Sequence, residues 1–103
     1  MNLPLDHTRI ERENRDFAGT AGVSAGAACL KLLPAFRDAR TGRVEIARFG
    51  DGRPAPMHLI EGLPAEWALE RDAAGVVVAL RPEIECGFVR GEHFYTRAEA
   101  AAL

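Results

Sequence analysis

The feature that most constrains this fold is a series of short segments with the two-residue period of β-strands, which begins at residue 30. In the first segment, Leu30, Leu32 and Phe36 point to one face. Lys31 and Arg37 point to the other. Further segments of this kind, separated by turn residues, lie at 44–49, 67–71, 76–81, 84–90 and 93–95. Short strands at regular spacing predict a mainly β (α+β) chain: a small antiparallel meander of hairpins that forms a half-open barrel or a bent sheet.

The first hairpin is predicted from the turn residues between its strands. Asp38 can accept a local backbone hydrogen bond, and Gly42 can adopt a positive φ. Pro34 has no N–H to donate to a neighbouring strand. It therefore predicts that the first strand lies at a sheet edge or contains a bulge.

Two further hairpins follow. Residues 72–75 form the turn of the second, and the β-branched run that begins at Val76 predicts a strand buried on both faces. In the third, Gly91 and Glu92 suit a type II′ turn. Such a turn places Arg90 opposite His93, Val89 opposite Phe94 and Phe88 opposite Tyr95.

The two ends of the chain differ in their helix signals. Residues 1–16 have no clean apolar period, so they form either a short helix after Asp6, with charge pairs at i and i+4, or an extended and irregular arm. Thr96 and Glu99, in contrast, have the spacing of a capping box, which predicts a short C-terminal helix.

A strap rich in glycine and alanine, Phe17–Leu30, separates the arm from the first strand. Such small residues let a backbone lie close against its own sheet or a neighbour's edge. The predicted organisation is an N-terminal arm and strap, residues 1–29, and a single small β domain with a C-terminal helix, residues 30–103.

Length and composition favour one compact domain in a reducing compartment. The chain has 103 residues, of which 48% are hydrophobic and 27% charged. Its longest uncharged run is the strap, which has too few strong hydrophobes for a membrane span or a signal peptide. Cys29 and Cys86 form no C-x-x-C motif and read as buried small hydrophobes. We therefore expect a cytoplasmic protein without a membrane partner, and twelve arginines against one lysine suggest a GC-rich bacterial source.

Several chemistries lack their sequence patterns. Gly19, Gly22 and Gly26 do not have P-loop or dinucleotide spacing, so no cofactor is predicted. No two histidines or cysteines have the spacing of metal ligands, and His58 reads as a partly exposed strand residue. In the predicted third hairpin, Cys86 lies roughly 13 Å along the strand from the pair of His93, too far for a catalytic dyad.

Charge is distributed unevenly. Residues 31–53 carry six basic and three acidic side chains, whereas residues 54–103 carry four basic and eight acidic ones. The basic group of interest comprises Arg37, Arg40, Arg43, Arg48 and Arg53. These arginines can bind phosphates of a nucleic acid, or pair with carboxylates of the second half within the chain or across a homodimer.

The function expected from these features is that of a non-catalytic protein-binding domain, of an accessory, regulatory or inhibitor type, that acts through a β-sheet surface. Its partner is another protein or a second copy of itself. The candidate partner-binding residues are the five arginines above and the aromatic residues Trp67, Phe88, Phe94 and Tyr95. Two alternatives stay open: a nucleic-acid-binding small barrel that uses the basic hairpin, and a small enzyme whose site is assembled from distant residues.

Overall fold

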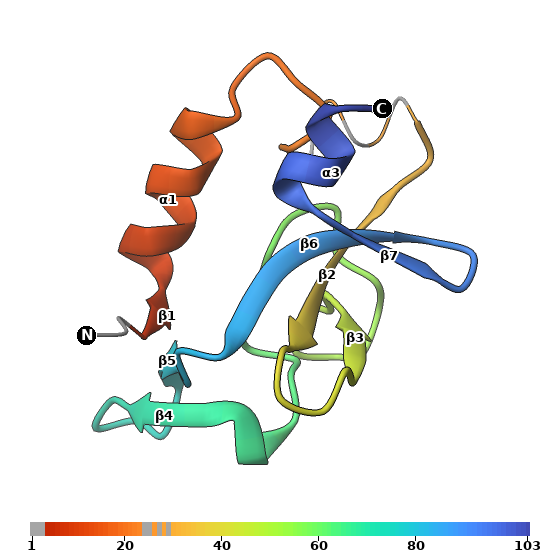
Figure 1. Ribbon diagram of the computed structural model, residues 1–103. Helices are drawn as coiled ribbons and strands as arrows, with labels where there is room; N and C mark the ends of the chain where they lie inside the picture. Colours follow the sequence, from red (N-terminus) through yellow and green to blue (C-terminus); the bar gives the residue numbers. More distant parts are fainter. Residues whose placement is uncertain (1–3, 24–25, 27, 29) are drawn as a thin grey trace.

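The computed structural model describes residues 4–23, 26, 28 and 30–103 and shows a mainly β fold with two antiparallel sheets (Figure 1). The larger sheet has the strand order β3 (Val44–Ile46), β2 (Leu33–Asp38), β6 (Ile84–Arg90) and β7 (His93–Thr96). The smaller has the order β1 (Leu5–Asp6), β5 (Val77–Leu80) and β4 (Ala68–Arg71). The helical elements are α1 (His7–Asp16), the 3₁₀ turn η1 (Ala65–Trp67) and α3 (Arg97–Ala101).

This arrangement confirms the predicted fold class. The three predicted strand pairs form the hairpins β2–β3, β4–β5 and β6–β7, and no closed barrel is seen in the described ranges. The larger sheet is completed by β2 and β6, which are distant in sequence but pair along six residues. In Figure 1, α3 lies against β6 and β7, and α1 rises from β1 beside the smaller sheet.

The third hairpin has the predicted register. Arg90 pairs with His93 across the turn, and the Val89–Phe94 and Phe88–Tyr95 pairs follow as expected. Gly91 adopts a φ of +63°, which an L side chain rarely tolerates. Beyond the turn, the capping box is also confirmed: the Thr96 hydroxyl accepts the Glu99 N–H at 3.1 Å, and the Thr96 N–H donates to Glu99 Oε1 at 2.9 Å.

The first hairpin confirms the turn but corrects the reading of Pro34. Asp38 Oδ1 accepts the Arg40 N–H at 2.9 Å, and Gly42 has a φ of +79°. However, β2 lies between β3 and β6, so the proline is in a central strand rather than at an edge. The Pro34 carbonyl accepts the N–H of Ala47, and in an antiparallel pair of this kind the nitrogen of Pro34 faces the Ala47 carbonyl, to which it has no N–H to donate. Because the Ala47 carbonyl accepts an N–H from Ala55 instead, the missing donor leaves no unpaired group there.

The second hairpin is less buried than its sequence suggested. Gly75 has a φ of +83° and closes the turn through its N–H to the Asp72 carbonyl. Burial then increases along β5, from Val76, which is 50% exposed just before the strand, to Ala79 and Leu80, which are buried. The prediction of a strand buried on both faces is therefore wrong at its beginning. Leu80, at the end of the run, packs into the apolar cluster that contains Phe36 and Trp67, whereas Val76 lies beside the exposed turn.

The N-terminal arm is helical and takes part in the β fold. Asp6 caps α1 by accepting the Arg9 N–H at 2.9 Å, and Arg9 pairs with Glu13 at 3.1 Å, as the helical alternative predicted. Leu5 is fully buried and pairs with Leu80. The arm thus supplies β1 to the smaller sheet. Among the described helices, none is long and apolar enough to cross a bilayer.

Two apolar clusters hold the elements together. The larger contains Phe36, Trp67, Leu80 and Ile84 and joins the two sheets, and the smaller contains Leu32, Phe88 and Ala100 beneath α3. Cys86 is buried as predicted, whereas the prediction for Cys29 lies outside the described residues.

Candidate functional site

The arginines around the tip of the first hairpin bind carboxylates of the same chain. Arg37 Nε lies 2.6 Å from Glu85 Oε1, and Arg40 Nε lies 3.5 Å from Glu83 Oε1. The Arg37 guanidinium also stacks on the ring of Phe94, at 4.5 Å from its centroid. The acidic second half of the chain therefore supplies counter-ions to Arg37 and Arg40.

The remaining candidate arginines are also engaged. Arg43 contacts Glu66 at 2.7 Å and Glu45 at 3.0 Å, and hydrogen bonds to both carboxylates, first to Glu45, raise the pKa of its guanidinium. Arg53 pairs with Asp51 at 2.7 Å. Arg48 instead donates to the Gly52 carbonyl at 2.8 Å.

The candidate aromatic residues belong mainly to the core. Trp67 is 1% exposed, Phe88 is fully buried and Phe94 is 8% exposed, so a partner cannot reach them without a change in the fold. Tyr95 is half-buried, between the His93 ring at 4.2 Å and the Arg90 guanidinium at 5.7 Å. The nine candidate residues therefore do not form one continuous aromatic and basic surface.

Cys86 has the properties of a structural thiol. It lies opposite Phe36 in the β2–β6 pair, and burial raises the pKa of its thiol to about 12, with the Arg97 charge acting in the opposite direction. The thiol is therefore protonated at neutral pH and is a poor nucleophile. His93 is exposed at the far end of the hairpin, where it pairs with Arg90.

A buried polar cluster was not found from the sequence. Arg97, 3% exposed, donates to the Gly22 carbonyl at 2.9 Å and to His58 Nδ1 at 3.3 Å, and its Nε lies 3.2 Å from Glu13 Oε1. This arginine therefore joins α3 to α1 and to the strap. Gly22 has no room for a side chain, because a Cβ would meet the Phe17 ring and the Arg97 carbonyl.

The prediction for His58 is wrong, since the residue is 6% exposed. Its Nε2 lies 2.7 Å from the Gly87 carbonyl and donates to it, which leaves Nδ1 to accept from Arg97. Burial, followed by the charge of Arg97, lowers the pKa of His58 to about 4. The ring is therefore neutral and fixed. For this buried pair the sequence offered one signal. Arg97 stands at the start of the predicted C-terminal helix, where the helix dipole disfavours a cation.

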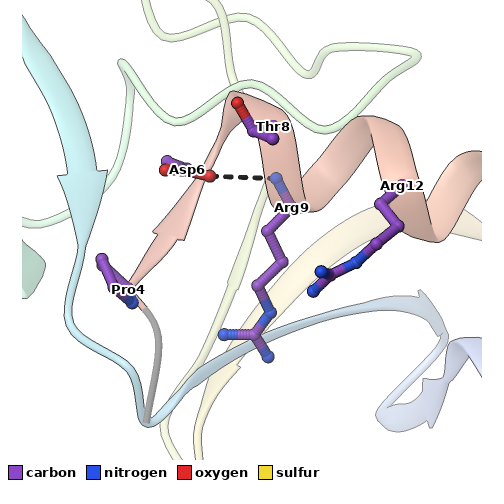
Figure 2. Close-up of a pocket in the computed structure, with 5 residues that line it drawn as sticks. All are labelled: Pro4, Asp6, Thr8, Arg9 and Arg12. Carbon is purple, nitrogen blue, oxygen red and sulfur yellow. Dashed lines mark hydrogen bonds between the residues drawn. The ribbon is translucent and has the colours of Figure 1, made fainter. Parts of the chain in front are cut away.

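Two surface pockets differ in chemistry. Figure 2 shows the first, about 200 Å³, where the side chains of Arg9 and Arg12 extend from α1 beside the Asp6 cap. Two of its polar groups take part in the structure of the arm, since Asp6 accepts the Arg9 N–H and Arg9 pairs with Glu13. This pocket consequently reads as part of the structure of the arm.

The second pocket, about 280 Å³, is mainly apolar and lies where β2 begins. Its lining residues are Ala28, Lys31, Leu32, Leu33, Pro34 and Pro56. Leu33 is 45% exposed, and Met57, directly after Pro56, is also 45% exposed. We call the exposed residues Leu33, Pro56 and Met57 the β2 apolar surface. No sign of this surface was visible in the sequence, because a strand with a proline and alternating leucines reads as core.

No cluster of three or more histidine, cysteine or acidic side chains suited to a metal ion occurs in the part of the chain that the structure describes. Comparisons with models of protein families, with curated proteins and with solved structures find no match for this chain.

Proposed function

We propose that this chain is a non-catalytic protein-binding domain that contacts its partner through the β2 apolar surface. The observation that carries the proposal is the exposure of two large hydrophobic side chains: Leu33, which lines an apolar pocket, and Met57, which directly follows the lining residue Pro56. Contiguous exposed apolar groups with polar surroundings are typical of interaction sites. Methionine also adapts its shape to a partner at little cost.

The lining of the pocket suits a protein partner. Five of its six lining residues are apolar, and two of these are prolines, so the pocket of about 280 Å³ accommodates an inserted apolar side chain. Such an anchor in a pocket is the usual centre of a protein interface.

The state of Cys86 also favours binding over catalysis. It was the nucleophile that the sequence offered, and its thiol is buried with a raised pKa. The five arginines of the first hairpin support no separate nucleic-acid site, because four of them pair with carboxylates.

The proposal is tested with neutral polar substitutions, Leu33→Gln and Met57→Gln. Leu69→Gln is the matched control, because Leu69 is 54% exposed but lies in β4, in the other sheet. Each tagged variant is used for affinity purification from the source cells with quantitative mass spectrometry. We expect a protein that is recovered with the native chain and Leu69→Gln and is depleted about tenfold with the other two variants.

Recovery of the same proteins by all four chains would contradict the proposal. Circular dichroism melts of each variant check that losses do not come from unfolding.

A further inference from the structure

We infer that the partner segment that enters the β2 pocket is a peptide with an acidic group next to its apolar anchor, and that Lys31 and Arg90 bind this acidic group. The inference rests on the proposed function and adds the chemistry of the partner.

Lys31 is the charged residue among those that line the pocket. It is exposed, it is the one lysine of the chain, and no ion pair of Lys31 is found with the described carboxylates. Its backbone is held in a left-handed conformation, with a φ of +59°, and its N–H donates to the Ala28 carbonyl at 3.1 Å. The pocket therefore has a cation at its wall without an internal counter-ion.

A second cation binds the residue that precedes Lys31. Val89 pairs with Leu33, so Arg90 lies alongside the beginning of β2. There its Nη1 donates to the Leu30 carbonyl, the residue before Lys31, at 3.3 Å. Arg90 is exposed and, like Lys31, pairs with none of the described carboxylates. Since the guanidinium uses one donor for the carbonyl and rests over the Tyr95 ring, it keeps further donors for a carboxylate.

The chain uses most of its arginines in internal ion pairs. Seven of the twelve have a carboxylate within 4.0 Å: Arg9, Arg37, Arg40, Arg43, Arg53, Arg81 and Arg97. The beginning of β2 differs because Lys31 lines an apolar pocket there, and Arg90 binds the carbonyl of the preceding residue. The complementary ligand carries a negative charge next to a hydrophobic group.

A peptide fits this chemistry better than a membrane surface does. The pocket is concave and takes one side chain, and Lys31 at its wall and Arg90 near the start of β2 can each bind a carboxylate group of a peptide. Membrane attachment by electrostatics uses clusters of about four to eight basic residues.

The experiment selects binders from a random peptide library displayed on phage, with the native chain as bait. We expect selected peptides to carry Asp or Glu, or a free C-terminal carboxylate, within a few residues of a large apolar side chain. The dissociation constant of a synthetic selected peptide, measured by fluorescence anisotropy, should increase between about 0.1 M and about 1 M salt, because salt screens exposed charges.

Two charge variants then test the assigned residues. Lys31→Asn keeps a side chain that tolerates the left-handed backbone, and Arg90→Gln keeps a donor for the Leu30 carbonyl. Each should weaken binding of the selected peptide about two- to fivefold. Arg71→Gln is the matched control: Arg71 is exposed and donates to the Gly75 carbonyl at 2.9 Å, but lies in β4, so binding should not change.

The outcomes separate the two proposals. Selected peptides that are apolar without acidic groups, or a dissociation constant unchanged in Lys31→Asn and Arg90→Gln, would overturn this inference and leave the proposed function standing. Selected peptides that bind Leu33→Gln and Met57→Gln as tightly as the native chain, or no selected peptide at all, would overturn the proposed function as well. Co-sedimentation with phosphatidylserine vesicles, lost in Lys31→Asn and Arg90→Gln, would assign the cations to a membrane surface and overturn the peptide.

Discussion

The two ends of strand β2 carry opposite kinds of surface. At its C-terminal end, Asp38 is buried, 2% exposed, and binds Arg81 at 3.4 Å, while Arg40 binds Glu83 at 3.5 Å. At its N-terminal end, Lys31 and Leu33 are exposed beside an apolar pocket. Charges that satisfy each other within the chain stabilise it, whereas a cation and apolar groups left exposed together are free to bind another molecule. The two ends of β2 therefore differ in whether their charged groups have partners within the chain.

The largest expected effect is at the paired end. Asp38→Ala should lower the free energy of unfolding by about 2–4 kcal/mol, because it removes the buried acceptor of the Arg40 backbone N–H and one of the two carboxylates that bind Arg81, leaving Glu83. Urea unfolding followed by circular dichroism measures this value. Asp51→Ala, which removes an exposed pair with Arg53, is the control and should change it by at most about 1 kcal/mol. Equal losses in the two variants would remove the contrast between buried and surface pairs.

The buried ring of His58 should make the free energy of unfolding depend on pH. Its ring contacts that of Phe36, with centroids 5.2 Å apart, and its pKa is lowered to about 4 from a model-compound value of 6.5. Between these two pH values the unfolded chain binds a proton that the folded chain does not, so stability falls as the pH falls from about 6.5 to about 4. The loss across this window should be about 3 kcal/mol.

Unfolding free energies measured from pH 7 to pH 4 test this dependence on His58. In His58→Gln the slope between pH 6.5 and pH 4 should become shallower, although the variant is less stable at pH 7. An identical slope in the native chain and the variant would show that other groups cause it.

At the unpaired end, Leu33→Gln should leave stability nearly unchanged. Leu33 is 45% exposed, so the free energy of unfolding should change by no more than about 0.5 kcal/mol while partner binding decreases. Parallel urea titrations and peptide binding measure both quantities on the same samples. A stability loss similar to that of Asp38→Ala would mean that this end belongs to the core.

The smallest effect is expected from the basic hairpin towards nucleic acids. Because Arg37, Arg40 and Arg43 each pair with carboxylates, we expect no mobility shift of single- or double-stranded DNA or RNA at physiological salt. A shift that weakens with salt and disappears when these three arginines are changed to Glu would contradict this expectation. It would make the paired end of β2 the functional one.

Local features of the fold were predictable because their causes are local. The register of the third hairpin follows from Gly91 and Glu92, and the start of α3 follows from the capping box at Thr96. The position of Pro34 was not predictable. A proline is accommodated in a central strand when the group opposite it finds another donor, and here that donor, the Ala55 N–H, comes from a separate loop.

The candidate site shows the same limit. The sequence identifies twelve arginines but not their partners. Arg37 therefore reads as a free charge until the pairing of β2 with β6 brings it to Glu85, 48 residues away in the sequence. Likewise, Trp67 and Phe88 suit an interface as well as a core, and only their burial decides.

By itself, the sequence determined the strand periods, the turns, the helix cap and the mainly β class, because each depends on residues a few positions apart. The tertiary structure alone decided that β2 lies between β3 and β6, that Arg97 and His58 are buried together, and that Arg90 binds the carbonyl of the residue before Lys31. These features depend on contacts between distant segments, where burial and the choice of partner set the energy of a charge.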